Sequence, residues 1–360
     1  MKTKTKTKTK SKIQKATVKK DLYSAVDLHG DNGFYCVIDE QDKRVFEKRL
    51  PNDLQTVLAE LEPYRPRLAK GIAVESTFNW YWLVDGLQEA GYQVQLVNTA
   101  AVPFYSGLKQ SDDQTDAFGL AHLQRLGILP TGYIYPKEQR GARDVLRRRM
   151  LLVQQRTAHL LSFKCLIQRQ TGKDVTSNQV KALKSEQVEQ WVEGPEEVLM
   201  GQTNVRVIEF LGQQIRQLEK AAETKIKLRP DYERLQEIPG LGRILNLVIM
   251  LETGPIDRFA TAGNYVSYCR AVPAERFSNE RKKGENNRKC GNKYLAWAWL
   301  EVANFALRYS PEIKKWYQRK LQRCGHLVVV ARKAVAAKLA KAGYYMLKNK
   351  EAFKIEQVFG

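Results

Sequence analysis

The sequence is poor in cysteine and has no long apolar run, and both features exclude classes of protein. Five cysteines occur among 360 residues, at scattered positions with no Cys-x-x-Cys pair and no zinc-binding spacing. We expect them to be small packing residues in a reducing, cytoplasmic environment. No apolar run approaches the ~20 residues of a membrane-spanning helix. The basic N-terminus is not followed by the apolar segment of a signal peptide, so we predict neither a membrane protein nor a secreted one.

Acidic residues are also in deficit, and this points to a polyanionic partner. The chain has 39 Asp and Glu against 60 Lys and Arg, a net charge of +21. Such an excess makes nucleic acid the leading partner. The length indicates two or three domains. Residues 1–20 begin with alternating Lys and Thr and are predicted to form a disordered basic arm, which either touches a nucleic-acid backbone or is a solvated tail.

Residues 21–140 carry the pattern of an α/β domain. Two apolar stretches separated by a Gly and Asn turn predict a hairpin near residues 22–39, and a third strand follows near 44–48. Helical spacing at 53–61 and 81–90 alternates with short apolar strands at 71–75 and 94–97. This order predicts a mixed sheet with helices packed on it.

Four acidic residues in this domain form an ordered set. Asp27 and Glu75 each end an apolar strand, and Asp113 and Asp116 open a predicted helix at a spacing that puts both on one face. Four converging carboxylates repel one another unless a hard cation lies among them, and oxygen ligands favour Mg²⁺. Such an ion can stabilise the attacking and leaving oxygens of a phosphodiester. The alternative is that Asp113 is a helix N-cap and Asp27 an ordinary turn residue.

Residues 141–230 are predicted to be helical. Leu146, Val153, Leu160 and Ile167 recur every seven residues, and a second helix near 205–228 has apolar residues in a 3–4 alternation. We interpret the two as arms of a coiled-coil element. It is either an antiparallel spacer or a surface for oligomerisation and nucleic-acid contact. The basic residues on it are Arg143, Arg147, Arg148 and Arg149.

The region 231–348 is predicted to be all-α, followed by a tail at 349–360. Pro239-Gly240-Leu241-Gly242 opens an apolar helix and resembles a helix-hairpin-helix phosphate grip. In such a grip Gly240 and Gly242 expose backbone N–H groups to a DNA backbone. The alternative interpretation is a simple tight turn.

A single serine, Ser278, precedes a basic, glycine-containing loop that leads into a helical pattern from Tyr294. Close backbone approach, a helix N-terminus and cationic side chains together suit a phosphodiester. Ser278 is then a candidate nucleophile if its proton has an acceptor; otherwise the loop grips phosphate and the serine is incidental. The residues expected to contact nucleic acid are Arg281, Lys282, Lys283, Asn287, Arg288, Lys289 and Lys293.

Three motifs carry a resemblance to a known family. They are AVDLHG with VEST, SDDQTDA, and PGLG followed by SNERKKGENNRKCGNKYLAWAWLEVANFA. In order and spacing they resemble the bridge-RNA-guided DEDD transposases of bacterial insertion sequences (insertion-sequence family 110, subgroup 1111). The resemblance spans about residues 20 to 345. The chain departs from many relatives in having one serine between Phe277 and Asn279 where they have Ser-Ser-Gly.

The resemblance implies a fold and a chemistry. It implies a RuvC-like domain with the RNase H fold, whose Mg²⁺-binding tetrad would be Asp27, Glu75, Asp113 and Asp116, with Asp112 as a neighbouring alternative to Asp113. It further implies a C-terminal transposase domain in which Ser278 forms a covalent 5′-phosphoserine, so that the acids and the serine make one composite site. The implied partners are double-stranded DNA, a structured non-coding guide RNA and further copies of the chain in a dimer or tetramer, in a prokaryotic cytoplasm near the nucleoid.

Two other functions fit parts of the pattern. A RuvC-like metal-dependent junction nuclease would use the four acids to hydrolyse DNA with water, and Ser278 would only bind phosphate. A covalent protein–DNA adduct distinguishes this enzyme from a recombinase. A binding protein with a degenerate RNase H fold is the other alternative, and the complete acidic set argues against it.

Overall fold

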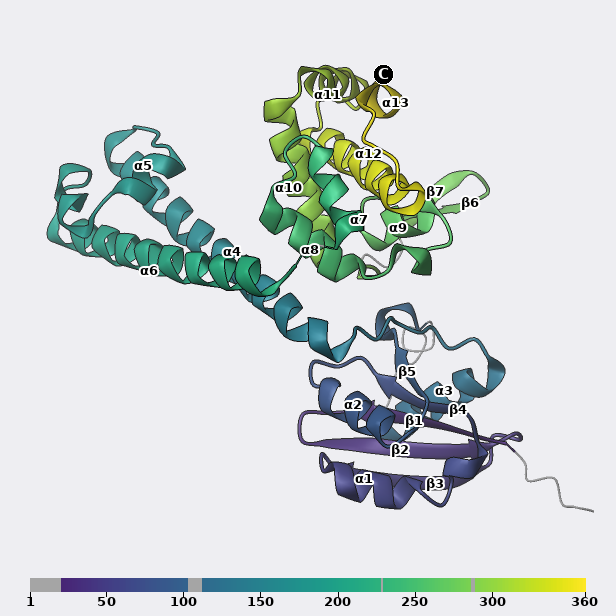
Figure 1. Ribbon diagram of the computed structural model, residues 1–360. Helices are drawn as coiled ribbons and strands as arrows, with labels where there is room; N and C mark the ends of the chain where they lie inside the picture. The colour runs from purple at the N-terminus through teal and green to yellow at the C-terminus, as the bar shows by residue number, and fades with distance from the viewer. Residues whose placement is uncertain (1–20, 103–111, 228, 286–288) are drawn as a thin grey trace, which may run out of the picture. The chain divides into compact units, whose positions relative to one another are not determined.

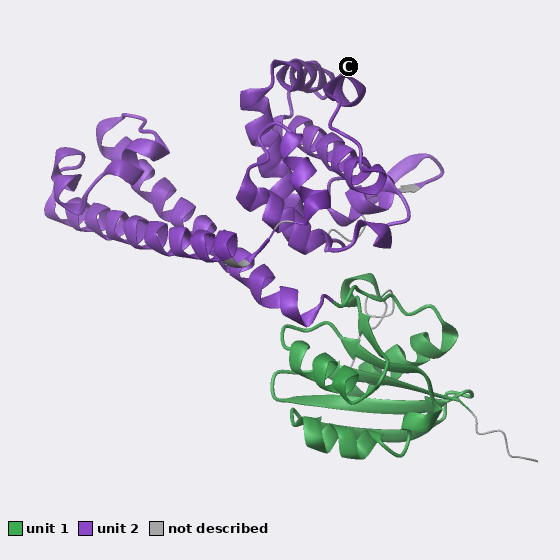
Figure 2. Ribbon diagram, in the orientation of Figure 1, with its two compact units in different colours: residues 1–134 green, residues 135–360 purple. Residues whose placement is uncertain are grey.

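The computed structural model describes residues 21–102, 112–227, 229–285 and 289–360. Within these residues the chain divides into two compact units, residues 1–134 and 135–360 (Figures 1 and 2). The predicted basic arm at 1–20 lies outside the described residues. The predicted boundary between the first two domains was residue 140, whereas the first unit ends at Ile134.

The first unit is built on a five-stranded sheet in the order β3-β2-β1-β4-β5. Strand β1 pairs antiparallel with β2 and parallel with β4; β2–β3 is antiparallel and β4–β5 parallel. The predicted mixed sheet is therefore confirmed. The strands are β1 (Leu22–Leu28), β2 (Asn32–Asp39), β3 (Arg44–Pro51), β4 (Leu68–Glu75) and β5 (Val94–Val97).

Helices cover both faces of this sheet. On one face α1 (Leu54–Leu61) and α2 (Tyr81–Glu89) bury leucines and valines against alternate residues of β1 and β4, such as Val26 and Val74. On the other face, α3 (Asp113–Leu126) packs on Ala25 and Ala73. Because successive side chains of a strand point to opposite faces, this division fixes which face every later strand residue occupies.

The second unit begins with two long antiparallel helices, α4 (Lys137–Thr171) and α6 (Pro195–Lys225), which lie side by side (Figure 1). The heptad residues Leu146, Leu160 and Ile167 are buried, and Val153 is half-buried. Helix α6 starts ten residues before the predicted position, because Pro195 and two acidic residues begin it favourably. The chain between the two helices forms α5 (Ser177–Ala182) and η4 (Ser185–Gln190), which close an apolar core around Phe163 and Val188.

The rest of the unit is a helical bundle around the fully buried Trp299, whose indole N–H donates to the Tyr265 hydroxyl (3.1 Å). Its longest helices are α10, α11 and α12. The elements are α7 (Pro230–Glu233), η5 (Arg234–Glu237), α8 (Arg243–Thr253), α9 (Ala262–Tyr268), β6 (Glu275–Ser278), β7 (Arg281–Glu285), α10 (Lys293–Tyr309), α11 (Pro311–Arg323), α12 (Val328–Asn349) and α13 (Ile355–Phe359).

Two features of this bundle correct the expectation of an all-α region with a free tail. Strands β6 and β7 form an antiparallel hairpin, whose two-residue turn places Asn279 and Glu280 at positive φ (52° and 61°). A turn of that kind matches the twist of a hairpin, but β7 is largely exposed and gives no apolar alternation to predict it from. The supposed tail is folded: Phe359 is buried and packs edge-on against Trp316.

Candidate functional site

The four predicted acids converge at one end of the sheet in the first unit. Ala25 and Ala73 face α3, and Asp27 and Glu75 follow each of them by two positions, so strand alternation turns both carboxylates to that same face. Pairing of Val26 with Val74 makes them neighbours on adjacent strands. Asp27 is 5% exposed and Glu75 is half-buried.

Helix α3 supplies the other two carboxylates. Its N-cap is Asp112, whose side chain accepts a hydrogen bond from the Thr115 backbone N–H (2.8 Å). The capping role considered for Asp113 thus belongs to its neighbour. Asp113 and Asp116 lie in the first helical turn, where the positive end of the helix dipole favours negative charge.

A histidine and an arginine complete this cluster. The Nε2 atom of His29 lies 3.3 Å from an Asp27 carboxylate oxygen and 3.2 Å from an Asp113 oxygen. Arg49 on β3 pairs with the second Asp113 oxygen (2.5 Å) and donates to Asn32 (2.7 Å). Both side chains therefore contact Asp113.

The surroundings shift the pKa values of these carboxyl groups in opposite directions. Burial, followed by the hydrogen bond with Asp27 and the charges of Asp27 and Asp116, raises the pKa of Glu75 to about 9. The hydrogen bond from Arg49 and the nearby His29 instead hold the pKa of Asp113 below its ordinary value. At neutral pH burial, together with the neighbouring carboxylates, therefore favours the protonated form of Glu75.

The donor set fits a hard divalent cation. Asp27, His29 and Asp113 each offer a ligand atom, all within 4.8 Å of one another. Glu75 interacts with Asp27 and Asp116, which adds two carboxylates to the same neighbourhood. Oxygen-rich sets of this kind suit Mg²⁺ or Mn²⁺, and a cation supplies the positive charge that Glu75 lacks.

Sequence reasoning missed His29 and Arg49. His29 was detectable in principle, since it follows Asp27 by two positions in an extended stretch. Arg49 carries no local signal. It reaches the cluster because Asp27 pairs with Phe34 and Phe34 pairs with Arg49, a register that is known only once the sheet has formed.

The serine singled out in the sequence lies on the β6–β7 hairpin of the second unit. Ser278 is exposed, ends β6, and pairs with Arg281 immediately across the turn. Figure 1 shows the hairpin extending from the helical bundle. The side chain of Ser278 is therefore accessible to a large substrate, and cationic residues lie near it on the hairpin.

Two comparisons with known families now bear on these sites. A transposase model of the DEDD type, from the IS110 family, matches residues 25–170, and a model described as the IS116/IS110/IS902 transposase family matches residues 232–318. The first match contains all four acids and the second contains Ser278. The chain belongs to the IS110 family of transposases. No curated protein matches the chain.

Family membership establishes the coarse function. This IS110-family transposase is a DNA transposase/recombinase that binds DNA, and its mixed sheet is compatible with a DEDD nuclease-like fold. The DEDD class implies use of a divalent metal ion, and the acidic cluster is a candidate site for it. No helix among the described residues is both long and apolar enough to cross a membrane.

The basic residues expected to contact nucleic acid lie on the hairpin and just beyond it. Arg281, Lys282 and Lys283 are exposed on β7, and Lys282 pairs with Glu275 (2.8 Å). Lys293 is exposed at the first position of α10. Lys289 precedes that helix, and its backbone carbonyl accepts from Arg270. The predicted contacts at Asn287 and Arg288 lie outside the described residues.

The two glycines of the PGLG turn have different surroundings. Gly240 has φ +84°, and a Cβ there would lie 2.6 Å from the backbone nitrogen of Ala306. Close packing on α10 therefore explains why this position is a glycine. Gly242 is the N-cap of α8 with open space around it, so its backbone is the better placed of the two for a phosphate.

A groove of about 1040 Å³ adjoins this turn. Trp297, Phe305 and Tyr309 of α10 give it an aromatic side. Its charged lining is mixed, with Arg149 and Arg243 against Glu223 and Glu301. The aromatic side is therefore the part of the groove suited to stacking against nucleic-acid bases.

Two of the four arginines expected on the surface of α4 are instead engaged in the interior. Arg143 and Arg147 donate to the carboxylate of Glu252 on α8 (3.1 and 2.6 Å), which is 2% exposed. Arg149 pairs with Glu219 on α6 (2.7 Å), and Arg148 is exposed. The reason is that a buried carboxylate needs paired donors, so these arginines join the long helices to the bundle.

Glu252 also binds the start of α10. Asn292 donates to it (2.7 Å) and simultaneously caps α10 by accepting from the backbone N–H of Tyr294 (2.8 Å). Burial alone would raise the pKa of Glu252, but the hydrogen bond from Arg147 and the two guanidinium charges outweigh burial and lower it. Glu252 is therefore an ionised, fully paired structural acid.

Proposed function

We propose that this transposase exchanges DNA strands through a covalent 5′-phosphoserine at Ser278, uses Mg²⁺ bound at Asp27, Glu75, Asp113 and Asp116, and is guided by a structured RNA of its insertion sequence. The observation that carries the metal part is the convergence of the four carboxylates, in which the ligand atoms of Asp27 and Asp113 lie within 4.8 Å of each other and Glu75 interacts with Asp27 and Asp116. The exposed serine between cationic strands supports the covalent part.

The serine chemistry balances without an external energy source. The Ser278 oxygen forms a bond to phosphorus, the bond from phosphorus to the 3′ oxygen breaks, and the departing oxygen takes a proton as the serine hydroxyl loses one. A 3′-hydroxyl of another strand then attacks the phosphoserine and restores the serine. One phosphoester replaces another in each step, so no ATP is consumed.

A metal ion held by Asp27, Glu75, Asp113 and Asp116 would supply charge neutralisation at the scissile phosphate and would favour ionisation of the attacking hydroxyl. Asp113 enters the reaction already ionised because Arg49 and His29 hold its pKa down. Glu75 would be more readily ionised beside a bound metal ion, since the added positive charge would oppose the burial and the neighbouring carboxylates that raise its pKa.

The partners follow from the charge and from the family. Double-stranded DNA and the guide RNA bind through Gly242, Arg281, Lys282, Lys283, Lys289 and Lys293, which read phosphate rather than sequence. The paired helices α4 and α6 are proposed to form the coiled coil of a dimer or tetramer, and the PGLG turn a helix-hairpin-helix element. A coiled coil would use side chains still exposed on the pair, such as Leu161 and Phe210, which are 55% and 58% exposed.

The test is a search for the covalent intermediate. Purified protein, the insertion sequence's RNA, Mg²⁺ and end-labelled DNA are combined and then denatured. We expect a DNA-linked protein band that is absent with Ser278→Ala, although that variant still binds DNA. Lys283→Ala, the matched control on the same hairpin, should bind DNA more weakly and still form the adduct at saturating DNA. Nicked DNA produced equally by Ser278→Ala, without an adduct, would replace the proposal with a nuclease that uses water.

A further inference from the structure

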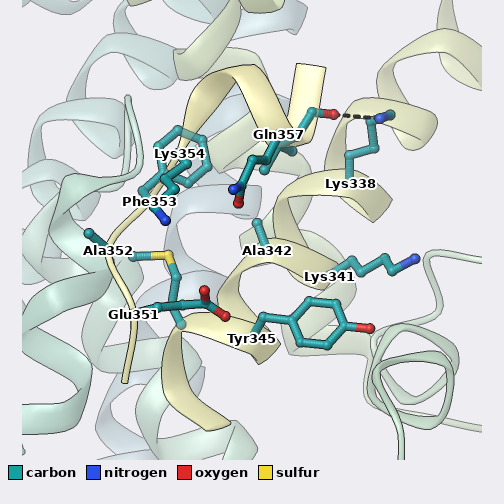
Figure 3. Close-up of a pocket in the computed structure, with 11 residues that line it drawn as sticks. Lys338, Lys341, Ala342, Tyr345, Glu351, Ala352, Phe353, Lys354 and Gln357 are labelled. Carbon is teal, nitrogen blue, oxygen red and sulfur yellow. Dashed lines mark hydrogen bonds between the residues drawn. The ribbon is translucent and has the colours of Figure 1, made fainter. Parts of the chain in front are cut away.

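A pocket of about 340 Å³ lies between α12 and the C-terminal segment, away from the hairpin in sequence (Figure 3). Its base is apolar and buried, formed by Ala342 and Met346 of α12. Its rim is polar and aromatic and comprises Lys341, Tyr345, Glu351, Phe353, Lys354 and Gln357. The volume falls within the usual range for sites of small organic ligands.

The wall formed by the C-terminal segment is fixed in place. Phe359 is buried against Trp316, and the backbone N–H of Phe353 donates to Glu237 (2.9 Å). Lys338 donates to the Val358 carbonyl and lies over the Trp316 ring (5.1 Å). The pocket is therefore preformed, which reduces the entropy lost on binding.

Several polar groups at the rim are free to bind a ligand. Among the described residues, the side chains of Lys341, Lys354 and Gln357 have no hydrogen-bond or ion-pair partner. Glu351 accepts from Asn349 through one carboxylate oxygen (2.7 Å), which leaves the other oxygen. Figure 3 shows the ends of Glu351 and Gln357 directed toward the same space, and Tyr345 beside it, 42% exposed.

The charge around the pocket selects a polyanion. Residues 311–360 contain twelve Lys and Arg against three Glu and no Asp. A duplex presents phosphates on its outside and keeps its bases stacked, so a duplex contacts a flat basic surface and leaves an apolar-floored pocket empty. An unpaired base has the flat apolar faces and polar edge that such a pocket fits.

We propose that this pocket binds an unstacked base of single-stranded DNA. The base lies on Ala342 and Met346 and against the Tyr345 ring, Glu351 and Gln357 bind its edge, and Lys341 and Lys354 bind the adjoining phosphates. This inference rests on the proposed function only in its choice of DNA, because strand exchange exposes unpaired DNA. The site would hold a displaced strand while its phosphodiester is being exchanged.

The test is equilibrium binding without catalysis, so failure of the Ser278 chemistry cannot affect it. Fluorescent oligodeoxycytidine of about a dozen nucleotides is compared with an abasic strand that has the same number of phosphates. Tyr345→Ala should weaken binding of the base-bearing strand about tenfold and leave the abasic strand unchanged. Tyr345→Phe should retain affinity because it keeps the ring.

The control is Lys333→Ala, an exposed lysine of α12 outside the pocket, which should weaken both strands equally. Equal losses with Tyr345→Ala on the two strands would overturn the base pocket. Cytosine offers an amino group to Glu351 and thymine does not, so oligodeoxythymidine should bind more weakly, and equal affinity would overturn edge recognition. RNA of the same sequence bound tenfold more tightly through Tyr345 would overturn the assignment to DNA.

Discussion

Two buried carboxylates, one in each unit, are almost equally shielded from water but have opposite surroundings. Asp27 is 5% exposed and lies among acids, with Glu75 hydrogen-bonded to it in a protonated state. Glu252 is 2% exposed and is ionised between two guanidinium groups and an amide. Burial favours the protonated form of Glu75 beside Asp27, whereas at Glu252 the guanidinium and amide donors outweigh burial and lower the pKa.

The comparison teaches how to separate a functional acid from a structural one in this fold. Around Glu252 the donors are complete, so nothing further can bind without displacing them. Around Glu75, burial and the neighbouring carboxylates oppose ionisation, and a bound cation would offset this cost. A carboxyl whose ionisation is opposed, as at Glu75, marks a functional site. A carboxylate with all its partners in place, as at Glu252, holds elements together.

The largest effect on activity should come from removing the charge of one acid in the cluster of the first unit. Asp113→Asn should lower Mg²⁺-dependent DNA cleavage about 100- to 1000-fold, a typical loss when a preorganised electrostatic group is removed. Asp112→Asn is the matched control, one residue away, because asparagine is also a good N-cap and keeps the hydrogen bond to Thr115. Cleavage rates with Mg²⁺ titration measure both. Similar losses in the two variants would show that the charge of the helix start, and not Asp113, is what matters.

Changes around Glu252 should affect the stability of the fold. Glu252→Gln leaves Arg143 and Arg147 without a counter-charge in the interior, so the free energy of unfolding should fall by about 3 kcal/mol. Glu219→Gln, which removes the more exposed partner of Arg149, should cost less than about 1 kcal/mol. Denaturant unfolding followed by circular dichroism gives both values. If the two losses are equal, Glu252 does not join α4 to the bundle as the contacts indicate.

The N-terminal sheet and its acids were predictable because their signals are local. Alternation of apolar residues gives the strands, a carboxylate at a strand end marks the sheet edge, and D-x-x-D spacing gives a shared helical face. Arg49 was not predictable because its position depends on the register across three strands. Likewise, Arg143 lies 109 residues from Glu252, so α4 alone shows only a basic helix.

The C-terminal hairpin shows a different limit. Its strands are short, and β7 is exposed except at Gly284, which is half-buried, so no apolar alternation separates it from a basic loop. Ser278 was identifiable as a candidate from its neighbours in the sequence, whereas its place at a turn depends on the backbone conformation of Asn279 and Glu280. The folded C-terminal segment was also missed, because its contacts, such as Phe359 with Trp316 and Phe353 with Glu237, join residues far apart in the sequence.

The smallest effect should be a gain in stability, and it sharpens the contrast between the clusters. Without metal, Glu75→Gln should raise the free energy of unfolding by about 1 kcal/mol near pH 8, because it replaces a carboxyl that the fold discourages from ionising. A carboxyl whose pKa rises from its ordinary value to about 9 on folding favours the folded state at low pH, and this contribution is lost as the pH rises toward 9. The advantage of Glu75→Gln should therefore be small near pH 5 and grow toward pH 9.

Added Mg²⁺ should reverse the order of stability of the two proteins, since only the wild type gains the full binding energy. Thermal unfolding with EDTA or Mg²⁺ across that pH range measures the effect, and a Glu75→Gln protein less stable than wild type in EDTA at every pH would mean that the acidic cluster is already compensated within the chain.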